Sequence, residues 1–483
     1  MINTHFLEKA EQLKPLLKEE TVVLEGSGRI LDDGDEIVFD FGNHFVGNIE
    51  IEFGCTGHHC DAPLMFEIQF AEIREELDQE TESYQGWISK SWIQKETVHL
   101  DDLPNSIRLQ RRYAFRYVKI HIISTSSNFN VTVKKLTACT FTSADDSKVP
   151  FIRMKPEDEA LDQAALRTLR SCMQEVYEDG PKRDRRLWLG DLRLQALTNY
   201  ETFQNNDLVA RCLYLFAGTT LEEGRLANNL FIHPEVECDY QTMFDYTLFF
   251  INTLWNYYEH TEDIETLREL EPVCTRQYEL LKDCFDENDL LIAEKAGNIF
   301  IDWNFTLDKQ ASGQAVWIYA VKDLVRIRKA LGLDCEEIIA DIEKKKAAAL
   351  TLFDRDKGLF VSGKDRQISW MSEIWMILAE VVDAETGRQI LKTLENTEDA
   401  VGMNSPYAYH HYIQALINCE LKETAYERMH EYWGGMLKNG SNTFWELYNP
   451  ENPSESPYGG IVVHSFCHAW SCTPSYFLRK YFY

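Results

Sequence analysis

The sequence lacks any apolar run approaching the roughly 20 residues that a membrane-spanning helix needs. Residues 1–20 are polar and amphipathic, without the uninterrupted apolar core of a signal peptide. We therefore expect a cytoplasmic protein rather than an exported or membrane-embedded one. No motif recurs at a fixed period, which disfavours a solenoid of the common repeat families.

Cysteine spacing of the kind that binds zinc is also missing. The 12 cysteines are scattered singly, several of them within apolar runs, and we expect them to be reduced and buried. Residues 55–60 read Cys-Thr-Gly-His-His-Cys, but no second Cys/His pair follows at zinc-finger spacing. We predict that this segment is a turn between strands and that the protein needs no metal and no organic cofactor.

Positive charge is scarce. The chain has 49 Lys and Arg against 79 Asp and Glu, a net charge of −30. Nucleic acid and anionic membranes would be repelled, so neither is predicted as a partner. The oligomeric state stays open, because the aromatic segment 476–483 could cover part of its own domain or face a second subunit of a homo-oligomer.

The pattern of apolar residues changes once along the chain, and 483 residues are too many for one hydrophobic core. Residues 1–20 have the spacing of an amphipathic helix. Over residues 21–146 apolar and polar residues alternate in short runs, which predicts an antiparallel β-sandwich with a long acidic loop at residues 74–94. Residues 147–483 follow helical spacing, with about a dozen helices, the last expected over residues 461–480. A toroid of paired helices would account for this second domain.

A charged loop lies near the start of the helical region. Residues 179–191 contain three carboxylates and four cations, with Gly-Pro near one end and Gly-Asp at the other. Gly180 and Pro181 break a preceding helix, and Asp191 is expected to cap the next one. Two interpretations stay open: an Arg–Asp network that joins two helices, or a catalytic loop that carries the aromatic Trp188.

Four later loops combine aromatic and acidic or histidine side chains, namely residues 231–235, 300–304, 443–448 and 464–470. Aromatic faces with nearby hydrogen-bonding groups suit a sugar, whose C–H faces stack on rings. Two carboxylates are enough to hydrolyse a glycosidic bond. The candidates are one acid of the charged loop and Glu446, whose aromatic neighbours should raise its pKa and make it a better base.

These motifs resemble those of one known family. Residues 179–191 are similar to the catalytic loop of the inverting α-L-rhamnosidases of glycoside hydrolase family 78. Residues 443–446 (Thr-Phe-Trp-Glu) resemble the family's Thr-x-Trp-Glu, which carries the base, and residues 465–471 resemble the segment that follows it. Residues 39–47 and 112–118 resemble the family's accessory β-domain. The resemblance implies an (α/α)6 barrel over residues 147–483.

The resemblance also implies roles for single residues. Asp179 and Asp191 would hold sugar hydroxyls, Trp188 would form a wall of the sugar site, and Glu446 would activate water. For His468, a structural, hydrogen-bonded role is an equal alternative. The predicted substrate-binding residues are Asp179, Arg183, Trp188, Asp191, Asp302, Trp303, Trp445 and His468.

The sequence departs from the family at the position of the general acid. The family usually has a glutamate there, and residues 179–191 contain none. One register of the loop places Asp184 at that position and the other places Arg185, which cannot release a proton at neutral pH. We therefore predict Asp184 as the acid and Glu446 as the base.

The predicted function is inverting hydrolysis that releases a terminal α-L-rhamnose or a similar deoxy-sugar from small glycosides. The expected partner is thus a small-molecule carbohydrate. Two alternatives remain: a carbohydrate-binding protein that keeps the barrel without turnover, and a barrel enzyme that acts on a different glycoside, such as a lyase or phosphorylase.

Overall fold

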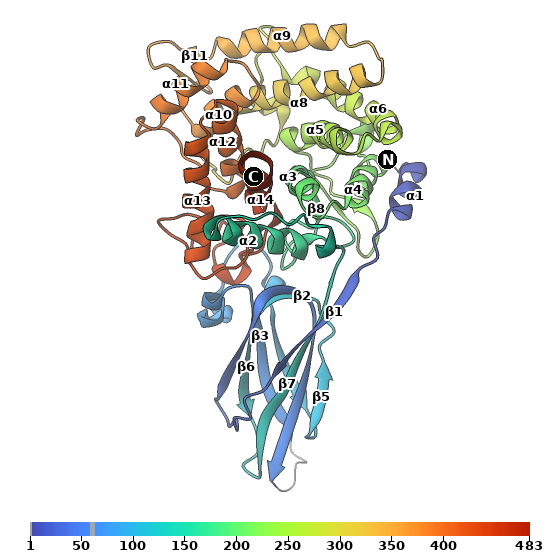
Figure 1. The fold of residues 1–483 in the computed structure, drawn as a ribbon, viewed down its shortest axis with the longest axis vertical. Helices are drawn as coiled ribbons and strands as arrows, with labels where there is room; N and C mark the ends of the chain where they lie inside the picture. Colours follow the sequence, from blue (N-terminus) through green and yellow to red (C-terminus); the bar gives the residue numbers. More distant parts are fainter. Residues whose placement is uncertain (1, 58–62) are drawn as a thin grey trace.

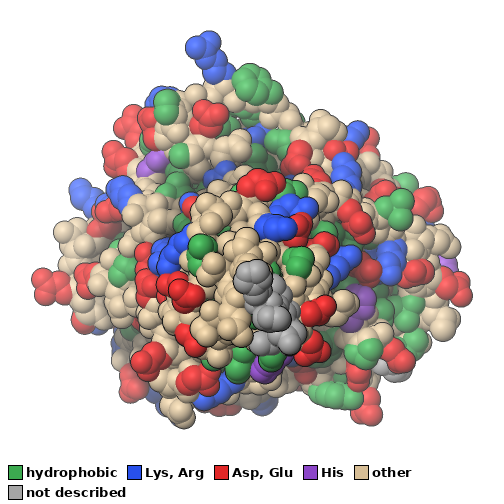
Figure 2. All heavy atoms as spheres, turned by 90° about the horizontal axis from the view of Figure 1, so that it is seen from below, with side chains coloured by type: hydrophobic (Ala, Val, Ile, Leu, Met, Phe, Trp, Pro, Cys, Tyr) green, Lys and Arg blue, Asp and Glu red, His purple; other side chains and the backbone are tan. Residues whose placement is uncertain are grey.

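The computed structural model describes residues 2–57 and 63–483, and it consists of an antiparallel strand domain followed by a helical domain (Figure 1). His58, His59 and Cys60 of the cysteine–histidine segment lie outside the described residues. Within those residues, no helix is both long enough and apolar enough to span a membrane. Figure 2 shows acidic, basic and hydrophobic side chains interspersed over the end of the molecule formed by the strand domain.

The N-terminal helix is shorter than predicted. Helix α1 covers Thr4–Gln12, and strand β1 already begins at Lys18. Pro15 has no N–H group to continue a helical ladder, and the β-branched residues after it pair with β7 instead. α1 packs against helix α4 of the helical domain, so the chain starts on one domain and then enters the other.

The strand domain is built around the long strand β2. The first half of β2 pairs with β6 and its second half with β7 and β5, all antiparallel. The ring centroids of Phe53 in β2 and Phe66 in β3 are 4.9 Å apart although these strands do not pair, so two layers enclose one core. The strands are β1 (Lys18–Glu25), β2 (Glu36–Gly57), β3 (Leu64–Ala71), β4 (Lys95–Leu100), β5 (Asn105–Arg108), β6 (Tyr113–Ser124) and β7 (Phe129–Thr142).

The helical domain is a ring of helices surrounded by a second ring. The inner helices are buried on nearly every side, whereas most outer helices bury a single stripe. The inner helices are α3 (Leu189–Glu201), α5 (Phe244–Thr261), α8 (Gln310–Ala330), α10 (Trp370–Leu378) and α12 (Pro406–Asn418), and the short α14 (Thr473–Phe477) packs against α3 and closes the ring. The outer helices are α2 (Pro156–Cys172), α4 (Asn206–Gly218), α6 (Ile264–Leu281), α9 (Glu336–Leu350), α11 (Ala384–Leu394) and α13 (Lys422–Lys438).

The loops of the helical domain contain short elements. The charged loop ends in β8 (Leu187–Trp188), which pairs with β9 (Asn229–Phe231), and β9 pairs with β10 (Glu237–Cys238). A turn of helix, α7 (Ala293–Ala296), precedes α8, and β11 (Phe353–Asp354) pairs with β12 (Leu359–Phe360) after α9.

The helix predicted over residues 461–480 does not form as one element. Two 3₁₀ turns, Ile461–Val463 and Ala469–Ser471, precede α14. The intervening backbone bonds to other parts of the protein: Ser465 O accepts from Glu446 N at 3.0 Å, and His468 N donates to Phe444 O at 2.9 Å. These long-range hydrogen bonds replace the helical ladder that the apolar spacing suggested.

Residues 74–94 lie in the predicted long loop between β3 and β4, and this loop contacts the helical domain. They contain three 3₁₀ turns: η1 (Arg74–Asp78), η2 (Thr81–Ser83) and η3 (Lys90–Trp92). Glu76 forms a buried ion pair with Lys182 of the charged loop, and the Lys182 ammonium also donates to His464 O at 2.8 Å. The strand domain therefore contacts the charged loop and holds it in place.

Candidate active site

The charged loop is a hairpin whose base is closed by hydrogen bonds of Asp179. The Asp179 carboxylate accepts from Arg186 N at 3.0 Å and from Asp184 N at 3.3 Å, and Asp179 N donates to Arg186 O at 3.0 Å. Gly180 is needed at the bend, because a Cβ there would lie 2.6 Å from both Arg183 O and Ser465 Oγ. The loop is therefore preorganised by its own backbone.

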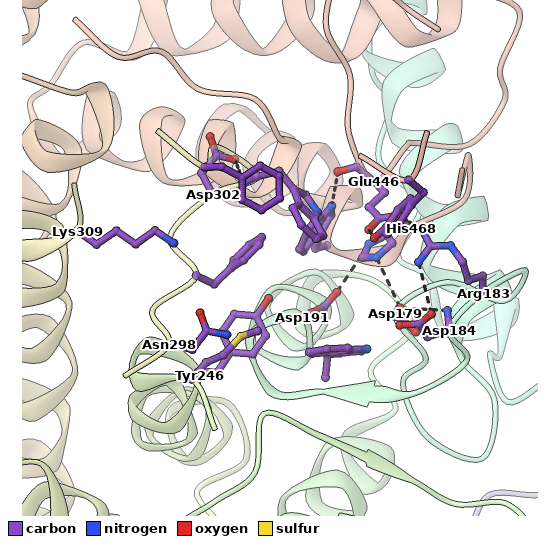
Figure 3. A pocket seen from close by; sticks show the side chains of 17 residues that line it. Asp179, Arg183, Asp184, Asp191, Tyr246, Asn298, Asp302, Lys309, Glu446 and His468 are labelled. Carbon is purple, nitrogen blue, oxygen red and sulfur yellow. Dashed lines mark hydrogen bonds and ion pairs between the residues drawn. The ribbon is translucent and has the colours of Figure 1, made fainter. Parts of the chain in front are cut away.

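This hairpin forms one wall of a cavity of about 280 Å³ (Figure 3). Asp179, Arg183 and Asp184 lie together at one end, and Asn298 and Lys309 lie at the other. Nine of the ten predicted site residues line the cavity: Asp179, Arg183, Asp184, Trp188, Asp191, Asp302, Trp303, Glu446 and His468. The exception is Trp445, whose ring packs behind the cavity against Tyr448 and Phe466 and is 1% exposed.

Glu446 follows α13 and is held by two donors. Its carboxylate accepts a hydrogen bond from the Arg183 guanidinium and another from the Tyr458 hydroxyl. The Arg183 guanidinium also lies 3.8 Å from the centroid of the Tyr458 ring. Burial raises the pKa of Glu446 above its usual value, while the Arg183 charge and the Tyr458 hydrogen bond oppose that rise.

Asp184 shares the same guanidinium. Its carboxylate lies 3.5 Å from Arg183 Nη1, while Glu446 is bound through Nη2. The Asp184 side chain is 24% exposed, in contrast to the buried Glu446. The next residue turns away, because the Arg185 guanidinium donates to Pro181 O and to Arg112 O of the strand domain.

Asp191 does not cap helix α3 as predicted. The N-cap is Trp188, without a side-chain capping bond, and Asp191 lies within the first turn. The helix starts earlier because the pairing of β8 with β9 ends at Trp188 and directs the chain into the ring. The Asp191 carboxylate is thereby free to face the cavity, and burial together with the nearby Glu446 raises its pKa well above the usual range.

His468 stands between two carboxylates. Its ring nitrogens lie 3.8 Å from Asp179 Oδ2 and 3.7 Å from Asp191 Oδ1. Burial and the nearby Arg183 charge lower the pKa of His468 well below its usual value, which favours the neutral ring. A neutral imidazole can donate with one nitrogen and accept with the other.

Four buried polar atoms around the cavity have no hydrogen-bond partner within the described residues. They are Trp188 Nε1, Asp191 Oδ1, Trp303 Nε1 and His468 Nδ1. Buried polar groups in proteins nearly always have a partner, and an unmade bond of this kind costs about 1–3 kcal/mol. Two of these atoms, Asp191 Oδ1 and His468 Nδ1, lie 3.7 Å from each other.

Asp302 positions Trp303 rather than presenting a free carboxylate. Its oxygens accept from Trp303 N at 2.8 Å, from Asn404 N at 2.7 Å and from the Ser405 hydroxyl. Burial raises the pKa of Asp302 to about 6. Together with the stacked rings of Phe300 and Trp470, whose centroids are 5.7 Å apart, Trp303 makes the cavity wall aromatic.

The remaining lining residues were not predicted as site residues. Phe300 and Trp470 lie in loops whose composition had suggested a sugar site, so that signal could have found them. Tyr458 has no such signal, since it lies in the Pro- and Gly-containing segment between the loops 443–448 and 464–470. The others, at helix ends or in loops, are Met243, Tyr246, Asn298, Phe305 and Lys309.

One group of potential metal ligands occurs within the part of the chain that the structure describes. His44, Glu72 and Cys467 bring their ligand atoms within 4.8 Å of one another at the domain interface. The carboxylate of Glu72 already accepts from His44 Nε2 and from Phe466 N, and His44 Nδ1 contacts Ser171 Oγ. We interpret this group as a hydrogen-bond network that joins the two domains.

Comparison with known proteins gives two family matches. The model described as the glycosyl hydrolase family 78 alpha-rhamnosidase N-terminal domain matches residues 11–140. The model described as the bacterial alpha-L-rhamnosidase 6 hairpin glycosidase domain matches residues 155–482. No sequence among curated proteins matches the chain. The family matches confirm the resemblance and the fold class predicted from the sequence.

Solved structures with a similar fold include rhamnosidases. A rhamnosidase from Klebsiella oxytoca with rhamnose bound is 40% identical, with a TM-score of 0.95 over 100% of this chain and 99% of that chain. A family 78 rhamnosidase of Bacillus sp. GL1 is 22% identical, with a TM-score of 0.78 over 95% of this chain and 47% of that chain. At the lower identity the likeness shows the fold alone.

The hairpin geometry generates a stability prediction. Gly180→Ala should lower the free energy of unfolding by roughly 1–3 kcal/mol, because the added Cβ collides with backbone at Arg183. Gly434→Ala is the matched control: it lies inside α13 with no atom near the added Cβ, and should stabilise by about 0.5–1 kcal/mol. Urea denaturation measures both, and equal effects of the two changes would contradict the tight bend.

Proposed function

Because this chain belongs to glycoside hydrolase family 78 and is a glycoside hydrolase of the rhamnosidase type, we propose that it releases terminal α-L-rhamnose or a similar deoxy-sugar by inversion. The observation that carries the proposal is an aromatic-walled cavity that holds both Glu446 and Asp184. A rhamnose ring has hydroxyls that can bond to the carboxylates and C–H faces that can contact the aromatic rings.

In the proposed reaction Glu446 is the general base. It removes a proton from a water molecule, whose oxygen attacks the anomeric carbon from one face. Asp184 is the general acid and gives its proton to the glycosidic oxygen as the bond between that oxygen and the anomeric carbon breaks on the opposite face. The products are the free sugar and the protonated leaving group.

The position of Arg183 supports the role of Glu446 as the base. Its charge and that of the buried Glu446 attract each other, which favours the carboxylate form that a base requires. The assignment of the acid to Asp184 is supported by the opposite directions of the two neighbouring side chains. Asp184 lines the cavity, whereas the Arg185 guanidinium bonds to carbonyls outside it.

The roles of the two carboxylates predict that substitutions of Glu446 and Asp184 change kcat differently for substrates with different leaving groups. Glu446→Gln should lower kcat on all α-L-rhamnosides at least roughly a hundredfold, since the attacking water loses its base. Asp184→Asn should impair alkyl rhamnosides by a similar factor but change turnover of α-L-rhamnosyl fluoride less than about threefold, because fluoride leaves without a proton. Steady-state kinetics on both substrates measures the contrast.

Asp179→Asn is the control for this pair of variants. It removes a carboxylate from the same loop and should lower turnover of the fluoride and of alkyl rhamnosides by similar factors, because Asp179 shapes the hairpin. If Asp184→Asn behaved in the same way, Asp184 would not be the acid. A wild-type protein that binds L-rhamnose and hydrolyses no rhamnoside would instead be a carbohydrate-binding protein.

Inversion has its own test. Proton NMR recorded in the first minutes of hydrolysis should show β-L-rhamnose as the initial product from an α-L-rhamnoside, followed by mutarotation. This outcome is expected because water, rather than a carboxylate, attacks the anomeric carbon. Initial formation of the α anomer would show retention and would overturn the assignment of Glu446 as a base acting on water.

The pKa of Glu446 generates a pH prediction. Burial raises that pKa above 4.5, so kcat/KM should fall as the pH drops through it and the base takes up a proton. The hydrogen bond from Tyr458 favours the ionised form, so Tyr458→Phe should move this acid limb to higher pH. Tyr448→Phe is the matched control, since the Tyr448 hydroxyl contacts Asn439 instead, and an unchanged limb in Tyr458→Phe would contradict the argument.

A further inference from the structure

A loop of the strand domain reaches the segment of the helical domain that carries Tyr458. This loop, residues 81–93, lies between β3 and β4. The Tyr84 hydroxyl donates to Tyr458 O at 2.8 Å, and Trp87 Nε1 donates to Pro457 O at 2.8 Å. Two hydrogen bonds therefore join the strand domain to consecutive residues of the helical domain, and the second of these residues donates its hydroxyl to Glu446.

The two backbones approach closely because glycines face each other. A Cβ at Gly86 would collide with Tyr458 O and with the Tyr84 hydroxyl. A Cβ at Gly459 would lie 3.1 Å from Gly86 Cα, and Gly459 has a φ of +82°, which glycine adopts readily. The contact thus leaves the backbone of Tyr458 little room to move toward the strand domain.

Side chains of both domains also enclose Tyr458. Tyr84 and Tyr458, which are 5% and 4% exposed, form a small buried cluster with Val462 and Val463. The centroid of the Trp87 ring is 5.4 Å from that of Tyr458, although Trp87 itself is 69% exposed. Tyr458 is therefore held by hydrogen bonds to its backbone segment and by two aromatic rings, all from the strand domain.

The orientation of Tyr458 matters because a hydrogen bond weakens steeply once its geometry departs from the favoured range. We propose that Tyr84, Gly86 and Trp87 are positioning residues of the strand domain, which hold Tyr458 where its hydroxyl can donate to the base, Glu446. The inference rests on the proposed function, and it assigns the strand domain a part in the reaction beyond its contact with the hairpin.

The proposal has a consequence for the ionisation of Glu446. The Tyr458 hydrogen bond favours the carboxylate, so a displaced Tyr458 would let burial raise the pKa of Glu446 further, and kcat/KM would then fall at a higher pH. The other titratable groups around this carboxylate or in the segments packed against it are Arg183, Asp184, Asp191, His464 and His468. Within the described chain, none of these five is hydrogen-bonded to a positioning residue. A change at a positioning residue should therefore reach Glu446 through Tyr458.

Gly86→Ala tests the proposal most directly, because the added methyl group must displace Tyr458 or the loop. For hydrolysis of 4-nitrophenyl α-L-rhamnoside, the acid limb of kcat/KM should move to higher pH by roughly 0.5–1 unit, and the plateau above it should change less than about threefold. Tyr84→Phe and Trp87→Phe each remove one hydrogen bond and should move the limb in the same direction by roughly 0.3 unit. Steady-state kinetics over a range of pH measures these shifts.

Each kind of substitution has a matched control. Gly434→Ala adds a methyl group with no atom near it, and Tyr117→Phe removes a hydroxyl elsewhere in the strand domain, where the tyrosine ring centroid lies 4.8 Å from the Arg116 guanidinium. Both should leave the limb unchanged. In a Tyr458→Phe background, where the hydroxyl is absent, Gly86→Ala should shift the limb less than roughly 0.2 unit, because the two changes act along one route.

Three results would overturn the inference. A lowered plateau with an unmoved limb in Gly86→Ala would show a merely structural role. Equal limb shifts with and without the Tyr458 hydroxyl would show that the effect reaches Glu446 by another route. If Gly86→Ala lost its cooperative urea transition, unmoved limbs in both Tyr84→Phe and Trp87→Phe would decide against the proposal.

Failure of the proposed function has a separate signature. A wild-type protein that hydrolysed no rhamnoside would contradict the proposed function and the inference with it. An active wild-type protein with unmoved limbs in the variants would contradict the inference alone.

Discussion

The buried guanidinium of Arg183 is the interaction on which the site depends. It contacts both proposed catalytic carboxylates, donates to Val463 O at 2.9 Å and lies over the ring of Tyr458. A cation removed from water is tolerated only when its partners surround it, and here those partners are the adjacent Asp184 and residues of the distant stretch 446–463. The contacts that hold Arg183 in place therefore also hold Glu446 and Asp184 at fixed positions relative to each other. Asp179 and Asp191, two further carboxyls nearby, add to the negative charge that this cation offsets.

The strand domain contributes ion pairs to this arrangement. Glu76 binds Lys182, the neighbour of Arg183, and Arg112 binds Glu178, the neighbour of Asp179. The start of the charged hairpin and its middle are thus each joined by an ion pair to the strand domain. A hairpin on the surface of the helical ring alone would lack both supports. The same domain contributes Trp92, Arg112 and Phe141 to the lining of a second cavity beside the hairpin.

Much of the fold and part of the site follow from local sequence features. The change from alternating to helical spacing separates the two domains, and the charged loop with the distant Trp-Glu pair identifies the two walls of the cavity. What could not be predicted depends on contacts between distant segments. Residues 461–472 have helical spacing, yet their backbone bonds to the Glu446 segment and to the strand domain. Trp445 looks like a sugar platform, but its side chain points into the core while the adjacent Glu446 faces the cavity.

The closure of the helical ring has a consequence for how the protein is made. The hairpin is synthesised within the first 200 residues, but Glu446, His468 and the short α14 that packs on α3 come from the last 40. While the chain is still growing on the ribosome, Arg183 and its neighbours have no acidic partner from the C-terminal segment, and α3 lacks part of its cover. Such late, long-range contacts slow folding and leave apolar surface exposed. The cavity is therefore incomplete until the segment from Glu446 to α14 has been synthesised and packed.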